Sequence, residues 1–152
     1  RTRAVRVKAC LLGILLWMNV YSFSTYRVVA MAKELTYWAM WMTTVHLGIS
    51  LMCSYKLTPR MPWLAAHHIL FELLAPLNLL ATSVYWSVLR GVVAKRFEDS
   101  PTESLHSGVM HLMPLIATIG LFQVTDIVIK ASHCLMLLPI ALLYGYANYL
   151  TT

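Results

Sequence analysis

Five long runs of mostly apolar residues, separated by short polar segments, make up most of the 152-residue chain. The runs cover residues 9–27, 35–57, 63–89, 101–128 and 131–150, to the nearest turn. Each run is close to the roughly 20 residues that a helix needs to cross about 30 Å of hydrocarbon. Lipid leaves no partner for unpaired backbone groups, and no run alternates with the period of two of a barrel strand. The pattern predicts an all-α fold: a polytopic transmembrane helical bundle of about five helices, forming one domain over residues 1–152.

The polar segments carry residues that end and begin helices. A proline-rich turn over residues 58–62 separates the second run from the third. The longest polar segment, residues 90–104, contains Ser-Pro-Thr-Glu at positions 100–103. This is the pattern of a capping box with proline at the first helical position. We therefore expect the fourth helix to begin at Pro101, with Ser100 as its N-cap.

Composition agrees with a membrane location. Apolar residues make up 59% of the chain and charged residues only 12%, whereas about a quarter of the residues of a soluble domain are charged. So few charges would not cover the surface of a small soluble fold. The net charge of +6 comes from basic residues near the ends of the runs, where they anchor helices to lipid headgroups. Membrane lipids are thus the expected partners, and nucleic acid is not.

The N-terminal residues bear on the choice of membrane. Arg1, Arg3, Arg6 and Lys8 precede the first acidic residue, Glu34. This fits the mature end of an organelle-imported protein and equally a basic cytoplasmic flank. We therefore expect an integral protein of the mitochondrial inner membrane or of the endomembrane system.

Two polar residues within the spans suggest chemistry. Thr43 lies about 12 Å from the outer end of the second helix, and His111 lies roughly 9 Å from the same side. A hydroxyl beside a neutral imidazole is the minimum arrangement for an activated nucleophile, and Ser107 is in position to orient the ring. The alternative for these residues is interhelical hydrogen bonding between small polar groups.

Several segments resemble one family. The run Trp41-Met42-Thr43-Thr44-Val45-His46-Leu47 resembles the start of the second helix in the androgen-induced membrane hydrolase family. The run from Leu105 to Pro114, together with Ala75-Pro76 and Tyr85-Trp86, is similar to later segments of that family in the same order. Its members have about six helices and hydrolyse fatty-acid esters of hydroxy fatty acids with a threonine nucleophile and a histidine. The resemblance implies that Thr43 is the nucleophile.

The resemblance leaves the histidine open. The family has two histidines three residues apart, followed by a proline. Counted back from Pro114, His106 matches the first and Val109 stands in the place of the second. His111 would then supply the imidazole through a local shift. The candidate catalytic residues are therefore Thr43, His111 and His106, and the family's sixth helix has no counterpart here.

A second reading needs no catalytic residues. Short loops, the lack of a soluble domain and the basic N-terminus also suit an accessory subunit of a large membrane complex. A respiratory or ATP-synthase assembly of the mitochondrial inner membrane is an example, and its other subunits would be the partners.

A third reading is a haem-binding membrane anchor, because bundle cytochromes hold haem between two histidines that face each other across helices. Six histidines are available: His46, His67, His68, His106, His111 and His133. No Cys-x-x-Cys or His-Glu-x-x-His pattern occurs, so no metal site is predicted.

Overall fold

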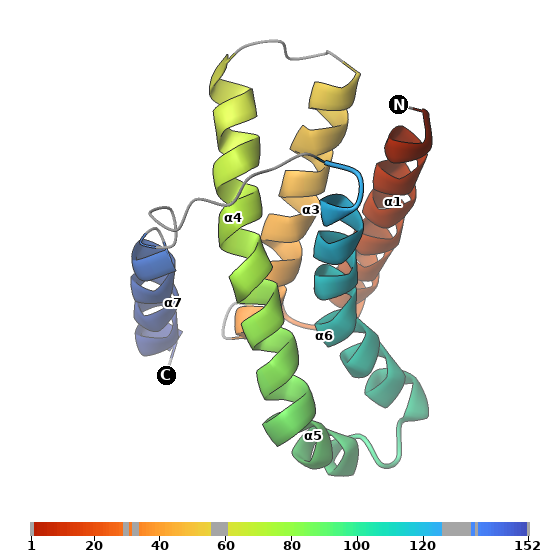
Figure 1. Ribbon diagram of the computed structural model, residues 1–152. Coiled ribbons are helices and arrows are strands. Elements are labelled where there is room, and N and C mark those ends of the chain that lie inside the picture. Colours follow the sequence, from red (N-terminus) through yellow and green to blue (C-terminus); the bar gives the residue numbers. More distant parts are fainter. Residues whose placement is uncertain are drawn as a thin grey trace.

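Helices make up the whole regular structure of the part of the chain that the computed structural model describes, residues 2–28, 31, 34–55, 61–125, 135 and 137–151. They are α1 (Thr2–Thr25), α3 (Leu35–Ser54), α4 (Met61–Val84), the π-helical turn η1 (Tyr85–Leu89), α5 (Arg90–Arg96), α6 (Pro101–Phe122) and α7 (Leu137–Thr151) (Figure 1). Because α4, η1 and α5 continue without a break from Met61 to Arg96, the described residues form five long helices. The predicted all-α bundle is confirmed.

The helix ends differ from the predicted ones in two places. Helix α1 begins at Thr2 rather than near residue 9, because the basic N-terminal residues are helical as well. The third predicted helix continues past residue 89 to Arg96 through η1. The predicted ends at residues 57 and 128 and the predicted start at 131 lie outside the described residues.

The start of α6 agrees with the sequence in part. The helix begins at Pro101 with Ser100 as its N-cap, as predicted. The Ser100 side chain makes no capping hydrogen bond, so the predicted capping box is wrong. The Ser100 carbonyl instead accepts from the amide of Ser104 at 3.1 Å, which is the first hydrogen bond of the helix.

Three of the described helices are long and apolar enough to cross a membrane: α1, the continuous helix Met61–Arg96, and α6. The chain is therefore described as an integral membrane protein. Helix α3 carries no formal charge, and its buried polar residues, among them Thr43, His46 and Ser50, face neighbouring helices rather than lipid. The 36-residue helix is about 54 Å long, more than the ~30 Å of hydrocarbon, so one of its ends extends beyond it.

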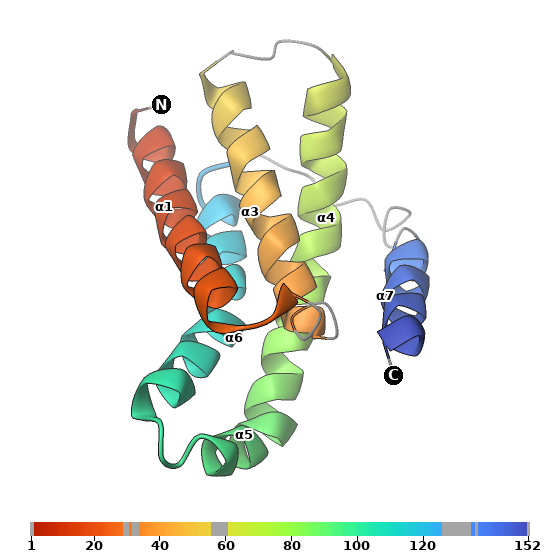
Figure 2. The ribbon, with the colours of Figure 1, turned by 180° about the vertical axis from the view of Figure 1, so that it is seen from behind.

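The bundle is formed by α1, α3, α4 and α6. Helix α3 contacts the other three, and α6 contacts both α1 and α4. Figures 1 and 2 show α7 beside α4, on the side away from α1. The Tyr144 ring of α7 packs edge-on against Trp38 of α3, with 6.0 Å between ring centroids.

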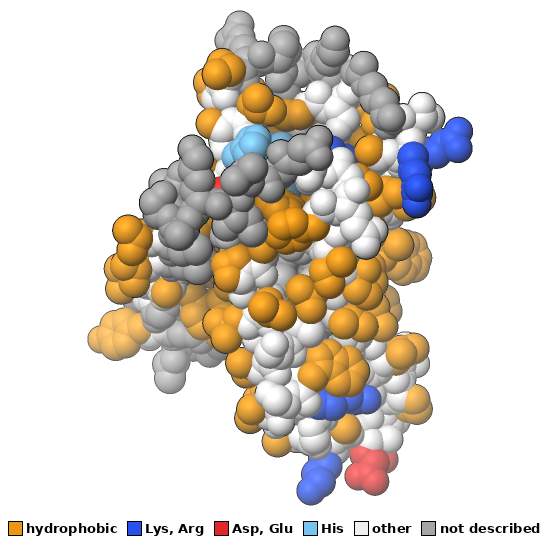
Figure 3. All heavy atoms as spheres, viewed as in Figure 1, with side chains coloured by type: hydrophobic (Ala, Val, Ile, Leu, Met, Phe, Trp, Pro, Cys, Tyr) orange, Lys and Arg blue, Asp and Glu red, His pale blue; other side chains and the backbone are white. Residues whose placement is uncertain are grey.

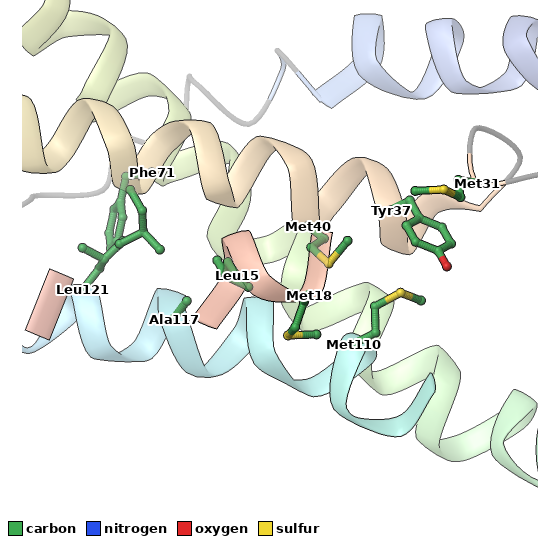
Figure 4. Packing of buried hydrophobic residues seen from close by; sticks show 10 residues of the cluster. Leu15, Met18, Met31, Tyr37, Met40, Phe71, Met110, Ala117 and Leu121 are labelled. Atoms are coloured by element: carbon green, nitrogen blue, oxygen red, sulfur yellow. The ribbon is translucent and has the colours of Figure 1, made fainter. Parts of the chain in front are cut away.

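The buried hydrophobic side chains lie between α1, α3, α4 and α6 (Figure 4). The cluster consists of Leu15, Met18, Met31, Tyr37, Met40, Leu47, Phe71, Met110, Ala117 and Leu121. Methionine fills irregular gaps between helices because its side chain is flexible. On the outside, hydrophobic side chains cover much of the face in Figure 3, and Lys and Arg side chains gather toward its two ends. This is the surface that lipid favours.

Candidate functional site

A cavity of about 560 Å³ opens between the start of α3, the segment α4–η1–α5 and the first half of α6. Its volume is within the range of small-molecule sites in proteins. Most of its wall is apolar, with Leu80, Val84, Leu89 and Val93 along the continuous helix and Met110 on α6. The cavity also receives a small set of polar and aromatic groups: Tyr26, Glu34, Tyr37, Tyr85, Arg96, His106, Ser107 and His111.

His111 is held in one orientation on the wall of this cavity. Its Nδ1 lies 2.7 Å from the backbone carbonyl oxygen of Ser107, one turn earlier on α6. A carbonyl only accepts hydrogen bonds, so Nδ1 carries the proton and Nε2 of the neutral ring has a free electron pair. Within the described part of the chain, Nε2 makes no hydrogen bond. Ser107 thus orients His111 through its backbone carbonyl and leaves Nε2 without a hydrogen bond to any described residue.

Tyr85 supports the same imidazole from the other helix. Its ring stacks on that of His111 with 3.6 Å between centroids and 15° between planes. Its hydroxyl lies 3.2 Å from Ser107 Oγ. Tyr85 begins the π-helical turn, in which the amide of Arg90 donates to the Tyr85 carbonyl. Such turns shift the side-chain register of a helix and are frequent at functional sites.

Thr43 lies deeper in the bundle and is not part of the cavity wall. Its hydroxyl donates to the carbonyl of Ala39 at 2.7 Å and accepts from Asn78 Nδ2 at 2.9 Å. The side chain is fully buried. The structure therefore does not bring Thr43 and His111 together: among the described residues, no hydrogen bond joins them.

Asn78 links three helices around Thr43. Besides Thr43 on α3, its Nδ2 lies 2.8 Å from Thr118 Oγ1 and 3.2 Å from the Pro114 carbonyl, both on α6. The amide has two hydrogens for these three acceptors, so one hydrogen is shared. This is the interhelical bonding between small polar groups that was the alternative for these positions.

His106, the other histidine candidate, contacts α1. Its Nε2 lies 3.2 Å from the hydroxyl of Ser22, and its ring packs against Tyr21 with 4.4 Å between centroids. His106 also lines the cavity, whereas Ser22 is fully buried behind it. Ser22 was not among the predicted site residues, because a lone serine in an apolar helix has no spacing that marks it.

Two opposite charges lie at the end of the cavity. Glu34 precedes α3 and Arg96 ends α5, and both line the wall. The Glu34 side chain is exposed. Neighbouring groups nevertheless remove part of its hydration, which raises the pKa of the carboxyl. The positive charge of Arg96 opposes this rise in pKa.

A second polar cluster lies toward the other end of the bundle. His46 Nε2 is 2.8 Å from His67 Nδ1 and 3.1 Å from the His67 carbonyl. Because the carbonyl only accepts, His46 is the donor and His67 carries its own proton on Nε2. On the same side, Lys8 Nζ donates to Ser54 Oγ at 3.0 Å.

The histidine pair bears on the haem reading. His46 and His67 do face each other across α3 and α4, but their nitrogens are directly hydrogen-bonded at 2.8 Å. In this arrangement no iron and porphyrin fit between the two rings. His133 lies outside the described residues. Within the described ranges, no group of three or more His, Cys, Asp or Glu side chains is placed to hold a metal ion.

No protein-family model, curated protein or solved structure matches the chain. The cavity and the groups that line it are therefore the features that bear on function.

Proposed function

We propose that this multi-pass membrane protein binds a lipid ester in the cavity and hydrolyses it with His111 as general base. The observation that carries the proposal is the orientation of His111. Its Nδ1 is held by the Ser107 carbonyl at 2.7 Å, its ring lines an apolar cavity, and no described residue hydrogen-bonds to its Nε2. A base fixed in one tautomer, beside a place where a reactant can sit, is the central requirement of general-base catalysis.

The apolar wall supports a lipid as the reactant. Leu80, Val84, Leu89 and Val93 recur along one side of the continuous helix that borders the cavity. They offer an acyl chain a surface like that of the surrounding bilayer. The polar residues His106, Ser107 and His111 stand together on α6, where an ester group would be placed by its chains.

The proposed reaction consumes one water molecule. His111 Nε2 accepts a proton from the water as its oxygen bonds to the ester carbonyl carbon, giving a tetrahedral oxyanion. The Ser107 hydroxyl is the donor that we assign to this oxyanion. The bond between the carbonyl carbon and the alcohol oxygen then breaks, and His111 returns its proton to the leaving alcohol. The products are a fatty acid and an alcohol.

In the proposed reaction Thr43 is not the nucleophile, although the family resemblance implies that role. A threonine nucleophile needs its hydroxyl next to a base and next to the substrate. The buried Thr43 hydroxyl instead donates to the Ala39 carbonyl, at a position outside the cavity wall. We therefore favour attack by water over formation of an acyl-Thr43 intermediate.

The test is hydrolysis of a fluorogenic oleate ester by the protein purified in nanodiscs. His111→Gln should lower the rate by about 10²–10⁴-fold, because the proton acceptor is lost. His68→Gln is the matched control, since His68 does not line the cavity. A His111→Gln rate equal to that of the unsubstituted protein would contradict the proposal.

The accessory-subunit alternative has one feature in its favour. Helix α7 leaves large side chains uncovered, with Tyr149 80% and Leu142 73% exposed, and a neighbouring subunit would cover them as well as lipid does. A native gel of gently extracted membranes, with mass spectrometry of co-migrating proteins, separates the two functions. Migration in a large assembly would favour the subunit, and the identified neighbours would test the mitochondrial or endomembrane location.

A further inference from the structure

Two residues of opposite charge line the cavity. Glu34 and Arg96 both line it, from the start of α3 and the end of α5. Among the described residues, no ion pair or hydrogen bond joins their side chains, although each is within the electrostatic field of the other. A ligand is therefore able to meet both charges at once.

Arg96 suits an anionic group. Its guanidinium lies beside the ring of Phe97, 5.8 Å from the ring centroid, and it ends the helix that is longer than the hydrocarbon is thick. A basic residue at the end of a membrane-spanning helix usually lies at the level of the lipid headgroups. The planar fork of five N–H donors matches the oxygens of a phosphate group.

The surroundings of Glu34 suit a cation. Tyr26 and Tyr37 line the cavity with it, and their rings are arranged edge to face with 6.5 Å between centroids. Glu34 also lies within the electrostatic range of both tyrosines. Aromatic faces beside a carboxylate are the usual environment of an alkylammonium group.

We propose that the cavity selects glycerophospholipids with a zwitterionic headgroup, whose phosphate binds Arg96 and whose ammonium group binds beside Glu34, Tyr26 and Tyr37. The acyl chains then follow Leu80, Val84, Leu89 and Val93. This rests on the proposed function, for which it names the substrate class. In such a lipid the ester groups join the charged end to the chains, and His111 lines the same cavity.

The test measures lipid selection without turnover. The His111→Gln protein is placed in nanodiscs of equal parts phosphatidylcholine, phosphatidylglycerol and diacylglycerol, and the bound lipids are identified by native mass spectrometry. Phosphatidylcholine should be enriched. A second substitution, Glu34→Gln, should shift the ratio of bound phosphatidylcholine to phosphatidylglycerol by about two- to tenfold towards the anionic lipid.

Arg96 is tested in the same mixture. Arg96→Gln should remove the preference for both phospholipids over diacylglycerol, and Arg96→Lys should keep part of it because the charge remains. Lys95→Gln and Glu98→Gln are matched controls, since both side chains are exposed and neither lines the cavity. Thermal unfolding of each variant checks that the bundle is intact.

Two results would overturn the proposal: equal binding of the three lipids by the starting protein, or an unchanged lipid ratio in folded Glu34→Gln protein. Neither depends on hydrolysis. Selection of phosphatidylcholine without ester cleavage in the unsubstituted protein would leave the headgroup site standing and reject the hydrolase. Ester cleavage by the unsubstituted protein without selection of phosphatidylcholine would support the hydrolase and reject the headgroup site.

Discussion

The side-chain amide of Asn78 lies 2.9 Å from the hydroxyl of Thr43, and this hydrogen bond joins α4 to α3 in the middle of the bundle. Through this hydrogen bond, Thr43, the candidate nucleophile, helps to hold two helices together. The Thr43 hydroxyl donates a hydrogen bond to the Ala39 carbonyl and accepts one from the Asn78 amide. A hydroxyl bonded in this way is not poised to attack an ester, whereas the His111 ring lines the cavity.

The role of Thr43 is decided by two substitutions. Thr43→Val keeps the shape of the side chain and removes the hydroxyl, whereas Thr43→Ser keeps the hydroxyl. With water as the nucleophile, we expect Thr43→Val to retain ester hydrolysis within about tenfold of the unsubstituted rate, the loss reflecting repacking. Fluorogenic ester hydrolysis measures this, and a serine-hydrolase probe, which bonds covalently to a nucleophilic hydroxyl, should leave the unsubstituted protein unlabelled. Labelling of the unsubstituted protein, with labelling and hydrolysis both lost in Thr43→Val and both kept in Thr43→Ser, would restore the nucleophile role that the family resemblance implies.

Asn78 should contribute more to the free energy of unfolding than a residue with a single hydrogen bond, because its amide reaches three acceptors. Asn78→Leu removes a donor that reaches Thr43, Thr118 and Pro114, and it buries their oxygens against an apolar side chain. We expect the free energy of unfolding to fall by about 1–3 kcal/mol. Unfolding in mixed micelles with increasing SDS measures it. Ser83→Ala, an exposed position on the same helix, is the control, and an equal effect of both substitutions would argue against the three-helix link.

Tyr85 should act as a positioning residue for His111. Tyr85→Phe keeps the ring that stacks at 3.6 Å and loses only the hydroxyl near Ser107, whereas Tyr85→Leu loses the stack. Since aromatic stacking contributes about 0.5–1.5 kcal/mol, we expect Tyr85→Leu to lower kcat by about two- to tenfold. The nuclear magnetic resonance signals of the His111 ring should shift at the same time, because a ring current is removed. Unshifted signals would show that the ring is held by the Ser107 carbonyl alone.

His46 and His67 should be energetically coupled. Each single substitution to Phe leaves the partner nitrogen buried without its 2.8 Å hydrogen bond, but the double substitution leaves neither. The double variant should therefore be less destabilised than the sum of the two, with a coupling of about 0.5–3 kcal/mol. Additive losses would mean that the pair is not formed. A Soret band in the purified protein that is lost in His46→Phe would instead support the haem reading.

The class of fold could be predicted from the sequence because hydropathy and length are local properties. Each helix satisfies its own backbone hydrogen bonds, so an apolar run of about 20 residues forms a helix whatever lies beside it. The start of α6 at Pro101 follows from the restricted backbone of proline in the same way. The continuation to Arg96 was not predicted, because residues 90–96 are polar enough to resemble a loop and yet continue the helix.

The sequence by itself determined that this is a helical membrane protein with polar residues inside its spans, and it singled out Thr43, His106 and His111. Only the tertiary structure decided which of them share a site. Each residue turns a helix by about 100° and advances it by 1.5 Å, so equal depth does not imply facing side chains. The rotation and packing of α3, α4 and α6 direct Thr43 to Asn78, His111 to the cavity and Tyr85 onto His111. The Thr43–Asn78 contact joins residues 35 positions apart and the Tyr85–His111 contact joins residues 26 apart, and spacing along one chain carries no information about them.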